Sequence, residues 1–228
     1  MKRALLAFAV MLISVSIIAQ ENTDEIKTLF GNQGKQSIGG YGGINTSYGT
    51  VAGHDAIFIG GRGAVVLNHS LAIGLGGNGF ISETVYDNNL LEDYEFAGGY
   101  GGIIIEPIIG AKNPIHVSVP LLIGAGGVGY VKHWGDYNND GDYTNYDEDS
   151  NAFFIFEPGV EVEFNLVKFM RIAVTGSYRL TSNINLKYKD DPSTDNSLPD
   201  YMHEGTSIAP SDMLRGFNLG LIMKFGKF

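Results

Sequence analysis

Apolar and polar residues alternate along most of the chain that follows Gln36. A period of two is the pattern of β-strands, whose successive side chains point to opposite faces. The clearest segment carries Met170, Ile172, Val174, Tyr178 and Leu180 on one face, and Arg171, Ala173, Thr175, Ser177 and Arg179 on the other. The pattern predicts eight strands, at about 38–48, 55–67, 70–82, 94–108, 115–131, 152–165, 169–182 and 214–227.

The connections between these segments alternate between short and long. Tight turns follow the second, fourth and sixth strands, whereas long polar stretches at 83–93, 132–151 and 183–213 follow the third, fifth and seventh. Only the first connection of the long set, near 51–54, is short. A soluble β-sandwich also alternates, but this order of connections is typical of an eight-stranded antiparallel transmembrane up-and-down β-barrel. The short turns and both termini are then periplasmic, and the long loops lie outside the cell.

The first residues of the chain indicate export. Lys2 and Arg3 precede an apolar run that ends at Ala19, which is the pattern of a secretory signal peptide and too short for a membrane-spanning helix. We expect cleavage after Ala19, a short periplasmic segment at 20–37 and the barrel domain at 38–228. No later run is long enough for a spanning helix, so a membrane location requires a closed barrel, which leaves no backbone group unpaired in hydrocarbon.

Composition and net charge limit the kinds of covalent link and of binding partner that the protein can have. The chain has 32 glycines and no cysteine, which favours many strands and turns and excludes disulfides and a lipid-modified cysteine. Its net charge of −10 argues against nucleic acid as a partner. Most of the 25 acidic residues fall in the three long connections, so the outward surface is expected to be anionic.

The alternation places charged residues on the inward face of the predicted barrel. The interior of an eight-stranded barrel is just wide enough to be filled by side chains, and enclosed charges must pair or stay hydrated. We therefore expect an ion-pair network, with a proton or ion path as the alternative. The predicted network consists of Arg62, Glu106, Glu157, Glu161, Glu163, Arg171 and Arg179. The same inward set also contains His116, Lys224, Asn45, Asn78 and Asn218.

A second candidate site is a cation loop in the stretch 132–151. Oxygen-bearing side chains at the first, third and fifth positions, followed by glycine at the sixth, match the start of a calcium loop. The twelfth position is an aspartate rather than the usual glutamate, and an acidic solvated loop is the alternative. The candidate calcium ligands are Asp136, Asn138, Asp140, Asp142 and Asp147.

A third constellation resembles a hydrolase site. Glu106 lies near the end of one predicted strand, and His116 and Ser118 share a face of the next, so the three side chains could meet. A serine, histidine and carboxylate can generate a nucleophile, and the H-x-S spacing is similar to that of outer-membrane lipid A deacylases. A hydrogen-bonded plug near the turn is the alternative, and we favour it.

Several motifs together resemble the small outer-membrane β-barrel proteins of Bacteroidetes-type bacteria, which have porin-like or OmpA-like barrels. The resemblance rests on GGIIIEP at 101–107, PIHVSVP at 114–120, and EPGVEVEFNL at 157–166 followed by Arg171 and SYR at 177–179. It implies the fold, an outer-membrane location among lipid, and contact of the C-terminal strand with the insertion machinery. The outward residues of that strand alternate up to Phe225, and terminal Phe228 is out of phase, so either a bulge intervenes or Phe225 ends the membrane strand.

Three classes of function follow from these expectations. We favour a structural or surface-interaction barrel whose acidic extracellular loops meet an external partner. A lipid-modifying enzyme and a narrow small-solute channel are the alternatives. No cofactor is expected beyond the candidate calcium ion, and fold alone names no ligand.

Overall fold

A computed structural model of the chain describes residues 37–88, 90, 92–132, 147–188 and 206–228. Contacts divide the chain into two units, Met1–Lys35 and Gln36–Phe228, and all the described residues belong to the second. The predicted signal peptide at 1–19 and the segment up to residue 36 lie outside this part and remain predictions. No helix in the described part is long and apolar enough to cross a membrane.

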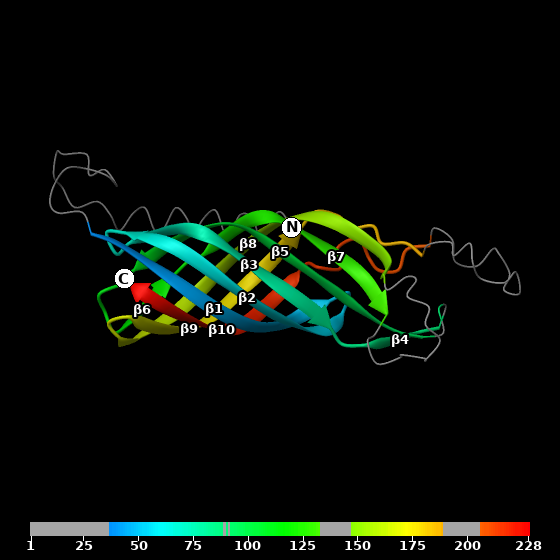
Figure 1. Cartoon of the computed structure of the whole chain (residues 1–228), viewed down its shortest axis with the longest axis horizontal. Coiled ribbons are helices and arrows are strands. Elements are labelled where there is room, and N and C mark those ends of the chain that lie inside the picture. The colour runs from blue at the N-terminus through cyan, green and yellow to red at the C-terminus, as the bar shows by residue number, and fades with distance from the viewer. Residues whose placement is uncertain (1–36, 89, 91, 133–146, 189–205) are drawn as a thin grey trace, which may run out of the picture. The chain divides into compact units, whose positions relative to one another are not determined.

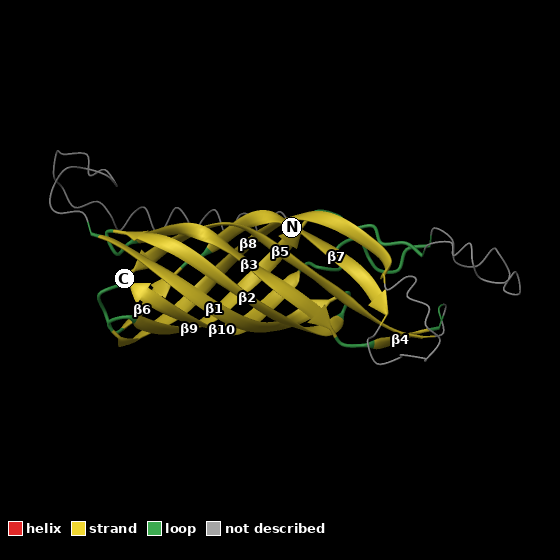
Figure 2. Ribbon diagram, viewed as in Figure 1, coloured by secondary structure: helices red, strands yellow, loops and turns green. Residues whose placement is uncertain are grey.

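The described residues form one antiparallel sheet, which winds obliquely around a common axis (Figures 1 and 2). Its strands are β1 (Ile38–Val51), β2 (His54–Leu67), β3 (Leu71–Ser82), β4 (Val85–Asp87), β5 (Glu92–Ile109), β6 (Ile115–Ser118), β7 (Leu121–Lys132), β8 (Asp147–Val167), β9 (Met170–Thr181) and β10 (Gly216–Lys227).

Eight of these strands form a closed ring of hydrogen bonds. The ring runs β1, β2, β3, β5, β7, β8, β9 and β10, and the last strand pairs with the first. The closing pair extends in one register from Gly40 opposite Lys227 to Gly49 opposite Asn218. Consequently none of these eight strands is left as an edge.

The predicted strand at 115–131 is divided into β6 and β7 around Pro120. Proline has no backbone N–H and cannot donate to the ladder. The register nevertheless continues, because β5 pairs Ile108 with Ser118 before the break and Ile105 with Leu121 after it. The break is therefore a missing donor and not an inserted residue. The short strand β4, within the predicted loop 83–93, was missed by the alternation.

The two ends of the ring differ in their connections. At one end, β2 joins β3, β5 joins β6 and β8 joins β9 through short turns, and β1 begins and β10 ends there. We call this the short-turn end. The opposite end, where the other connections lie, is the long-loop end; β4 lies there in Figure 1. Its β1–β2 turn is tight, with positive φ angles of 53° at Ala52 and 86° at Gly53.

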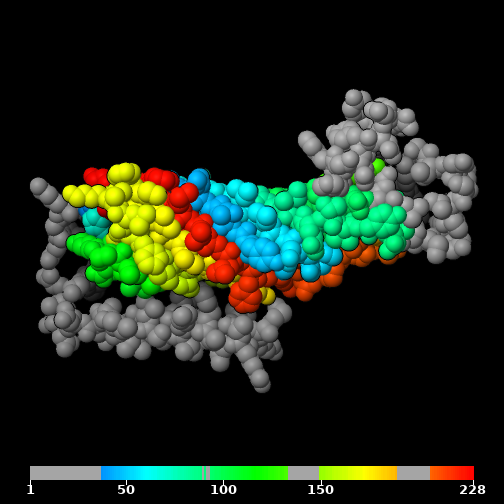
Figure 3. Space-filling model, turned by 90° about the horizontal axis from the view of Figure 1, so that it is seen from below, coloured from blue at the N-terminus to red at the C-terminus, as the bar shows by residue number. Residues whose placement is uncertain are grey.

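The two faces of the sheet have opposite character. The outward positions of β9, such as Val174 and Leu180, are exposed, whereas inward Arg171 and Arg179 are buried. This confirms the faces that the alternation predicts for this strand. The outward positions of β2 from Ile57 to Leu67, and of β10 from Phe217 to Phe225, carry no charged residue. Figure 3 shows strands lying side by side on one face of the sheet.

The inward face is mostly apolar near the long-loop end, where Arg179 and Asp87 are also buried. Most of its buried charged residues lie toward the short-turn end, beside a smaller apolar cluster. The apolar part is one cluster of aromatic and aliphatic residues, among them Phe58, Phe80, Tyr100 and Phe153. The β9–β10 connection joins this cluster through Ile184, Leu186, Met213 and Leu214. The expectation that the whole stretch 183–213 is a polar outer loop is therefore wrong for its two described parts, whose apolar residues are buried.

Candidate functional site

The charged part of the interior centres on Lys224 of β10. Its ammonium Nζ lies 2.6 Å from Glu106 Oε1 on β5, 2.8 Å from Glu161 Oε2 and 2.5 Å from Glu163 Oε1 on β8. Only 1% of the lysine surface is exposed, and the three glutamates are also buried. A buried ammonium needs compensating partners because removing it from water costs several kcal/mol. Here three carboxylates from two strands supply them.

Two arginines complete the charge balance of this cluster. Arg62 Nη2 lies 2.6 Å from both carboxylate oxygens of Glu161, and Arg171 Nη1 lies 3.2 Å from Glu163 Oε2. The cluster thus joins three acidic and three basic side chains from five strands of the ring. Charge-assisted hydrogen bonds of this kind are the stronger class, and each member leaves an uncompensated charge if it is removed.

The same cluster could have held a metal ion instead. One carboxylate oxygen from each of Glu106, Glu161 and Glu163 lies within 4.8 Å of the other two, which is a spacing that a divalent cation can bridge. The Lys224 ammonium is within hydrogen-bonding distance of all three carboxylates. The lysine therefore supplies the positive charge that a metal would supply.

The hydrolase-like residues join this cluster without forming a catalytic relay. His116 Nε2 lies 2.9 Å from Glu163 Oε2, and Ser118 Oγ donates to Glu163 Oε1 over 2.7 Å. Glu106 instead accepts from the Tyr41 hydroxyl and from Lys224. Among the described contacts none links His116 to Ser118, and the serine is fully buried. The geometry thus puts no histidine base next to the serine and gives a substrate no access to it.

Glu157 and Arg179 lie apart from the Lys224 cluster. The β8–β9 register sets them opposite each other, between the pairs Phe156 with Leu180 and Gly159 with Ser177. Glu157 nevertheless accepts neutral hydrogen bonds, at 2.6 Å from Ser177 Oγ and 3.3 Å from Asn218 Nδ2.

Arg179 turns away from Glu157. It donates to the Thr50 carbonyl over 2.6 Å, and its guanidinium lies 4.2 Å from the centre of the Phe58 ring. Its Nε and Nη1 have no hydrogen-bond partner among the described atoms. The structure therefore brings five of the seven predicted network residues into one cluster and leaves this pair without a direct ion pair.

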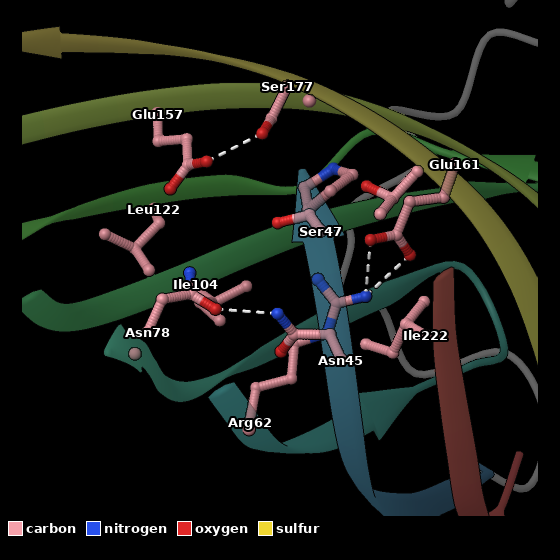
Figure 4. Close-up of a pocket in the computed structure, with 15 residues that line it drawn as sticks. Asn45, Ser47, Arg62, Asn78, Ile104, Leu122, Glu157, Glu161, Ser177 and Ile222 are labelled. Atoms are coloured by element: carbon pink, nitrogen blue, oxygen red, sulfur yellow. Dashed lines mark hydrogen bonds and ion pairs between the residues drawn. The ribbon is translucent and has the colours of Figure 1, made fainter. Parts of the chain in front are cut away.

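A cavity of about 70 Å³ lies between the Lys224 cluster and the apolar part of the interior. Figure 4 shows Glu157 and Glu161 on different sides of it with Ser47 between them, and Asn45 and Asn78 below, where Arg62 reaches Glu161. Asn45 donates to Asn78 over 2.6 Å. One water needs about 10–15 Å³ of such space, so this polar cavity has room for several.

Phe228 covers the charged cluster at the short-turn end. Its ring stacks on Tyr41 with the centres 5.8 Å apart, and the Arg171 guanidinium lies 3.8 Å from its centre. No bulge puts Phe228 out of phase, because β10 keeps one register with β1 as far as Lys227. Phe225 is thus the last outward aromatic residue of the strand, and Phe228 faces the interior.

The alternation placed Lys224 on the inward face of the last strand, but the predicted network did not include it. Its inward position was the sequence feature that could have added it to the network. Tyr41 was missed, since an inward tyrosine in a glycine-rich strand carries no sign of a carboxylate partner. Of the predicted calcium ligands, Asp136, Asn138, Asp140 and Asp142 lie outside the described residues. Asp147 begins β8, but its side chain is not described, so the calcium hypothesis remains a prediction.

Neither models of protein families nor curated proteins match this sequence.

Proposed function

We propose that this protein is an integral outer-membrane β-barrel of structural or surface-interaction type. The observation that carries the proposal is the inversion of polarity across the sheet. Phe217, Leu219 and Leu221 on the outer face of β10 are 76%, 66% and 52% exposed, while Lys224 of the same strand is buried. In water this arrangement would leave a continuous apolar surface unburied, and in lipid the same surface is satisfied.

The dimensions of the ring fit a bilayer. β9 and β10 have 12 residues each, and a tilted strand needs about 9–11 to cross the hydrocarbon core. The closed ring leaves no unpaired edge among its eight strands, which is the condition for a sheet in lipid. Exposed aromatic residues lie toward both ends, as in the aromatic girdles of such barrels. They are Tyr48, Phe154 and Phe217 toward the long-loop end and Phe169 and Phe225 toward the short-turn end.

In the proposed orientation the short-turn end faces the periplasm and the long-loop end faces outward. Barrels of this class have short periplasmic turns and longer extracellular loops. The acidic connections then form the outer surface, and it is there that an external partner would bind.

The filled interior favours this class over a channel or an enzyme. The Lys224 cluster fills the short-turn half, the apolar cluster fills the long-loop half, and the cavity between them is small. The candidate hydrolase residues are buried and have no relay geometry.

Fractionation tests the proposal. Full-length protein should be recovered from outer membranes by detergent, and its folded form should migrate differently from the boiled form on a gel. Recovery in the soluble periplasmic fraction, or a single band that heating does not shift, would contradict it.

A further inference from the structure

The exposed charged side chains of the ring differ between its two ends. Toward the short-turn end, the acidic residues in the described part of the chain all belong to the buried cluster inside the ring. The exposed charged side chains described there are three lysines, Lys112, Lys168 and Lys227. No ion pair joins any of them to another described residue. The long-loop end, by contrast, has exposed acidic residues such as Asp55 and Glu83.

Two of these lysines lie on neighbouring segments of the chain. Lys227 is the last residue of β10, and Lys168 lies in the turn between β8 and β9. Gly226 N donates to Phe169 O over 2.9 Å, so this turn is held against the end of β10. Like charges on neighbouring strands repel each other, and a bound anion would relieve that repulsion.

Each of the two lysines has an exposed aromatic neighbour. Phe169 follows Lys168 in the turn and is 63% exposed, and Phe225 precedes Lys227 by two positions on the outer face of β10 and is 43% exposed. Two residues of a strand span about 7 Å, so Lys227 lies that much closer to the short-turn end than Phe225 does. An aromatic ring followed by an ammonium toward the end of a strand is the arrangement expected where hydrocarbon meets lipid headgroups.

The wall beside Phe225 has no side chains. Gly42 on β1 pairs with Phe225, and Gly63 on β2 pairs with Gly42. Both glycines are exposed, and a Cβ at Gly42 would meet no other atom within 4 Å. The backbone here therefore leaves room for an acyl chain to lie against the ring of Phe225.

We propose that Lys168 and Lys227, together with Phe169 and Phe225, form a docking surface for one anionic phospholipid. A lysine ammonium binds phosphate as a point charge, and two of them close together favour a headgroup with a net negative charge. The acyl chains of the same lipid would cover the exposed rings and the glycine wall. A phospholipid thus satisfies both the charged and the apolar parts of this surface.

An acidic peptide suits this surface less well. Peptides commonly bind to sheets by adding a strand to an open edge, and the eight ring strands have none. The docking surface rests on the proposed function, in which the short-turn end faces the periplasm. It adds to that function a class of lipid and the periplasmic leaflet of the membrane.

Native mass spectrometry can measure this binding. Full-length protein refolded in detergent is titrated with phosphatidylglycerol, or with phosphatidylcholine of the same acyl chains as the neutral reference, and the dissociation constant of the first bound lipid is determined. Lys168→Gln and Lys227→Gln each remove one ammonium of the pair. Lys112→Gln is the matched control, because it removes the same charge from the β5–β6 turn at the same end.

We expect phosphatidylglycerol to bind more tightly than phosphatidylcholine. Lys168→Gln and Lys227→Gln should each weaken its binding about fivefold, which is the usual contribution of one lysine at an anionic lipid surface. Lys112→Gln should leave it unchanged. Equal binding of the two lipids, or an equal loss with Lys112→Gln, would overturn the docking surface. Displacement of the lipid by inorganic phosphate would show a site for free phosphate and would also overturn it.

The docking surface and the proposed function fail in different ways. Protein that is extracted from outer membranes in a heat-modifiable form but shows none of these lipid effects retains the proposed function and loses the docking surface. Protein that is recovered only in the soluble periplasmic fraction loses both.

Discussion

The two halves of the ring interior are filled by opposite means. Near the short-turn end, Lys224, Arg62 and Arg171 pair with three buried carboxylates, and each distance lies between 2.5 and 3.2 Å. Near the long-loop end, Phe58, Phe80 and their neighbours fill space by contact. Charged pairs fail when one partner is lost, because the other stays buried and uncompensated, whereas apolar packing tolerates exchanges of similar volume. Single substitutions should therefore lower stability more in the charged half than in the apolar half.

The largest effect is expected at Lys224. Lys224→Met keeps an unbranched side chain but leaves Glu106, Glu161 and Glu163 without their shared cation. We expect a loss of about 3–5 kcal/mol in the free energy of unfolding. Urea titration of the protein in lipid vesicles, followed by the fraction of heat-modifiable band, measures it. Adding Glu106→Gln and Glu161→Gln to Lys224→Met should restore part of the loss. If the single variant unfolds at the same urea concentration as the parent, the Lys224 cluster does not stabilise the fold.

The next largest effect is expected on the outer face, where an introduced charge would have no partner. Val174 lies outward between Val162 and Leu221, and Thr175 lines the cavity opposite Glu161. Val174→Arg should lower the free energy of unfolding by about 2–4 kcal/mol if this face meets the middle of the bilayer. Thr175→Arg is the matched control, since the added charge lies next to a carboxylate. Equal folding yields and urea midpoints for the two variants would contradict the assignment of faces.

A smaller effect is expected in the apolar half. Phe80→Leu removes ring contacts with Phe58 and Tyr100 but keeps an apolar side chain. We expect a loss of about 1 kcal/mol, since apolar exchanges of similar volume are usually tolerated within about 1.5 kcal/mol. The same urea titration measures it. A loss as large as that of Lys224→Met would remove the contrast between the two halves.

The smallest effect is expected at Glu157. This glutamate accepts from Ser177 and Asn218 and makes no ion pair among the described residues. Glu157→Gln keeps an acceptor oxygen, so the loss should stay near a neutral hydrogen bond, about 1 kcal/mol or less. Glu163→Gln, which disturbs contacts with Lys224 and Arg171, is the control and should lose at least about 3 kcal/mol. If the two variants unfold at the same urea concentration, Glu157 contributes as much to stability as Glu163 does, and the expected difference is wrong.

The alternation along the chain was enough to predict the eight ring strands and the faces of β9. Sequence could not predict which inward charges meet, because that depends on how the ring closes. Lys224 and Glu106 are 118 positions apart and meet only after β10 pairs with β1. Local spacing also misled at Arg179, which lies opposite Glu157 in register but donates to Thr50.

The burial of the β9–β10 connection was not predicted because of the residues that surround it in the sequence. Ile184 and Leu186 do alternate, but they stand in a stretch whose overall composition is polar. Burial there depends on aromatic residues of five other strands, which no short window of sequence contains. A break at Pro120 can be predicted from sequence, because proline lacks the backbone N–H donor. The unchanged register on both sides of the break cannot be predicted in this way.

The position of Lys224 on the last strand makes closure of the ring and neutralisation of its interior the same event. Before β10 pairs with β1 and β9, the side chains of Glu106, Glu161 and Glu163 are already in the chain, while their shared cation is not yet in place. An unclosed intermediate therefore carries excess negative charge on its inner face, which repels itself and retains water. Docking of β10 brings the ammonium that removes this charge. The strand that closes the ring therefore also carries the cation that neutralises its interior.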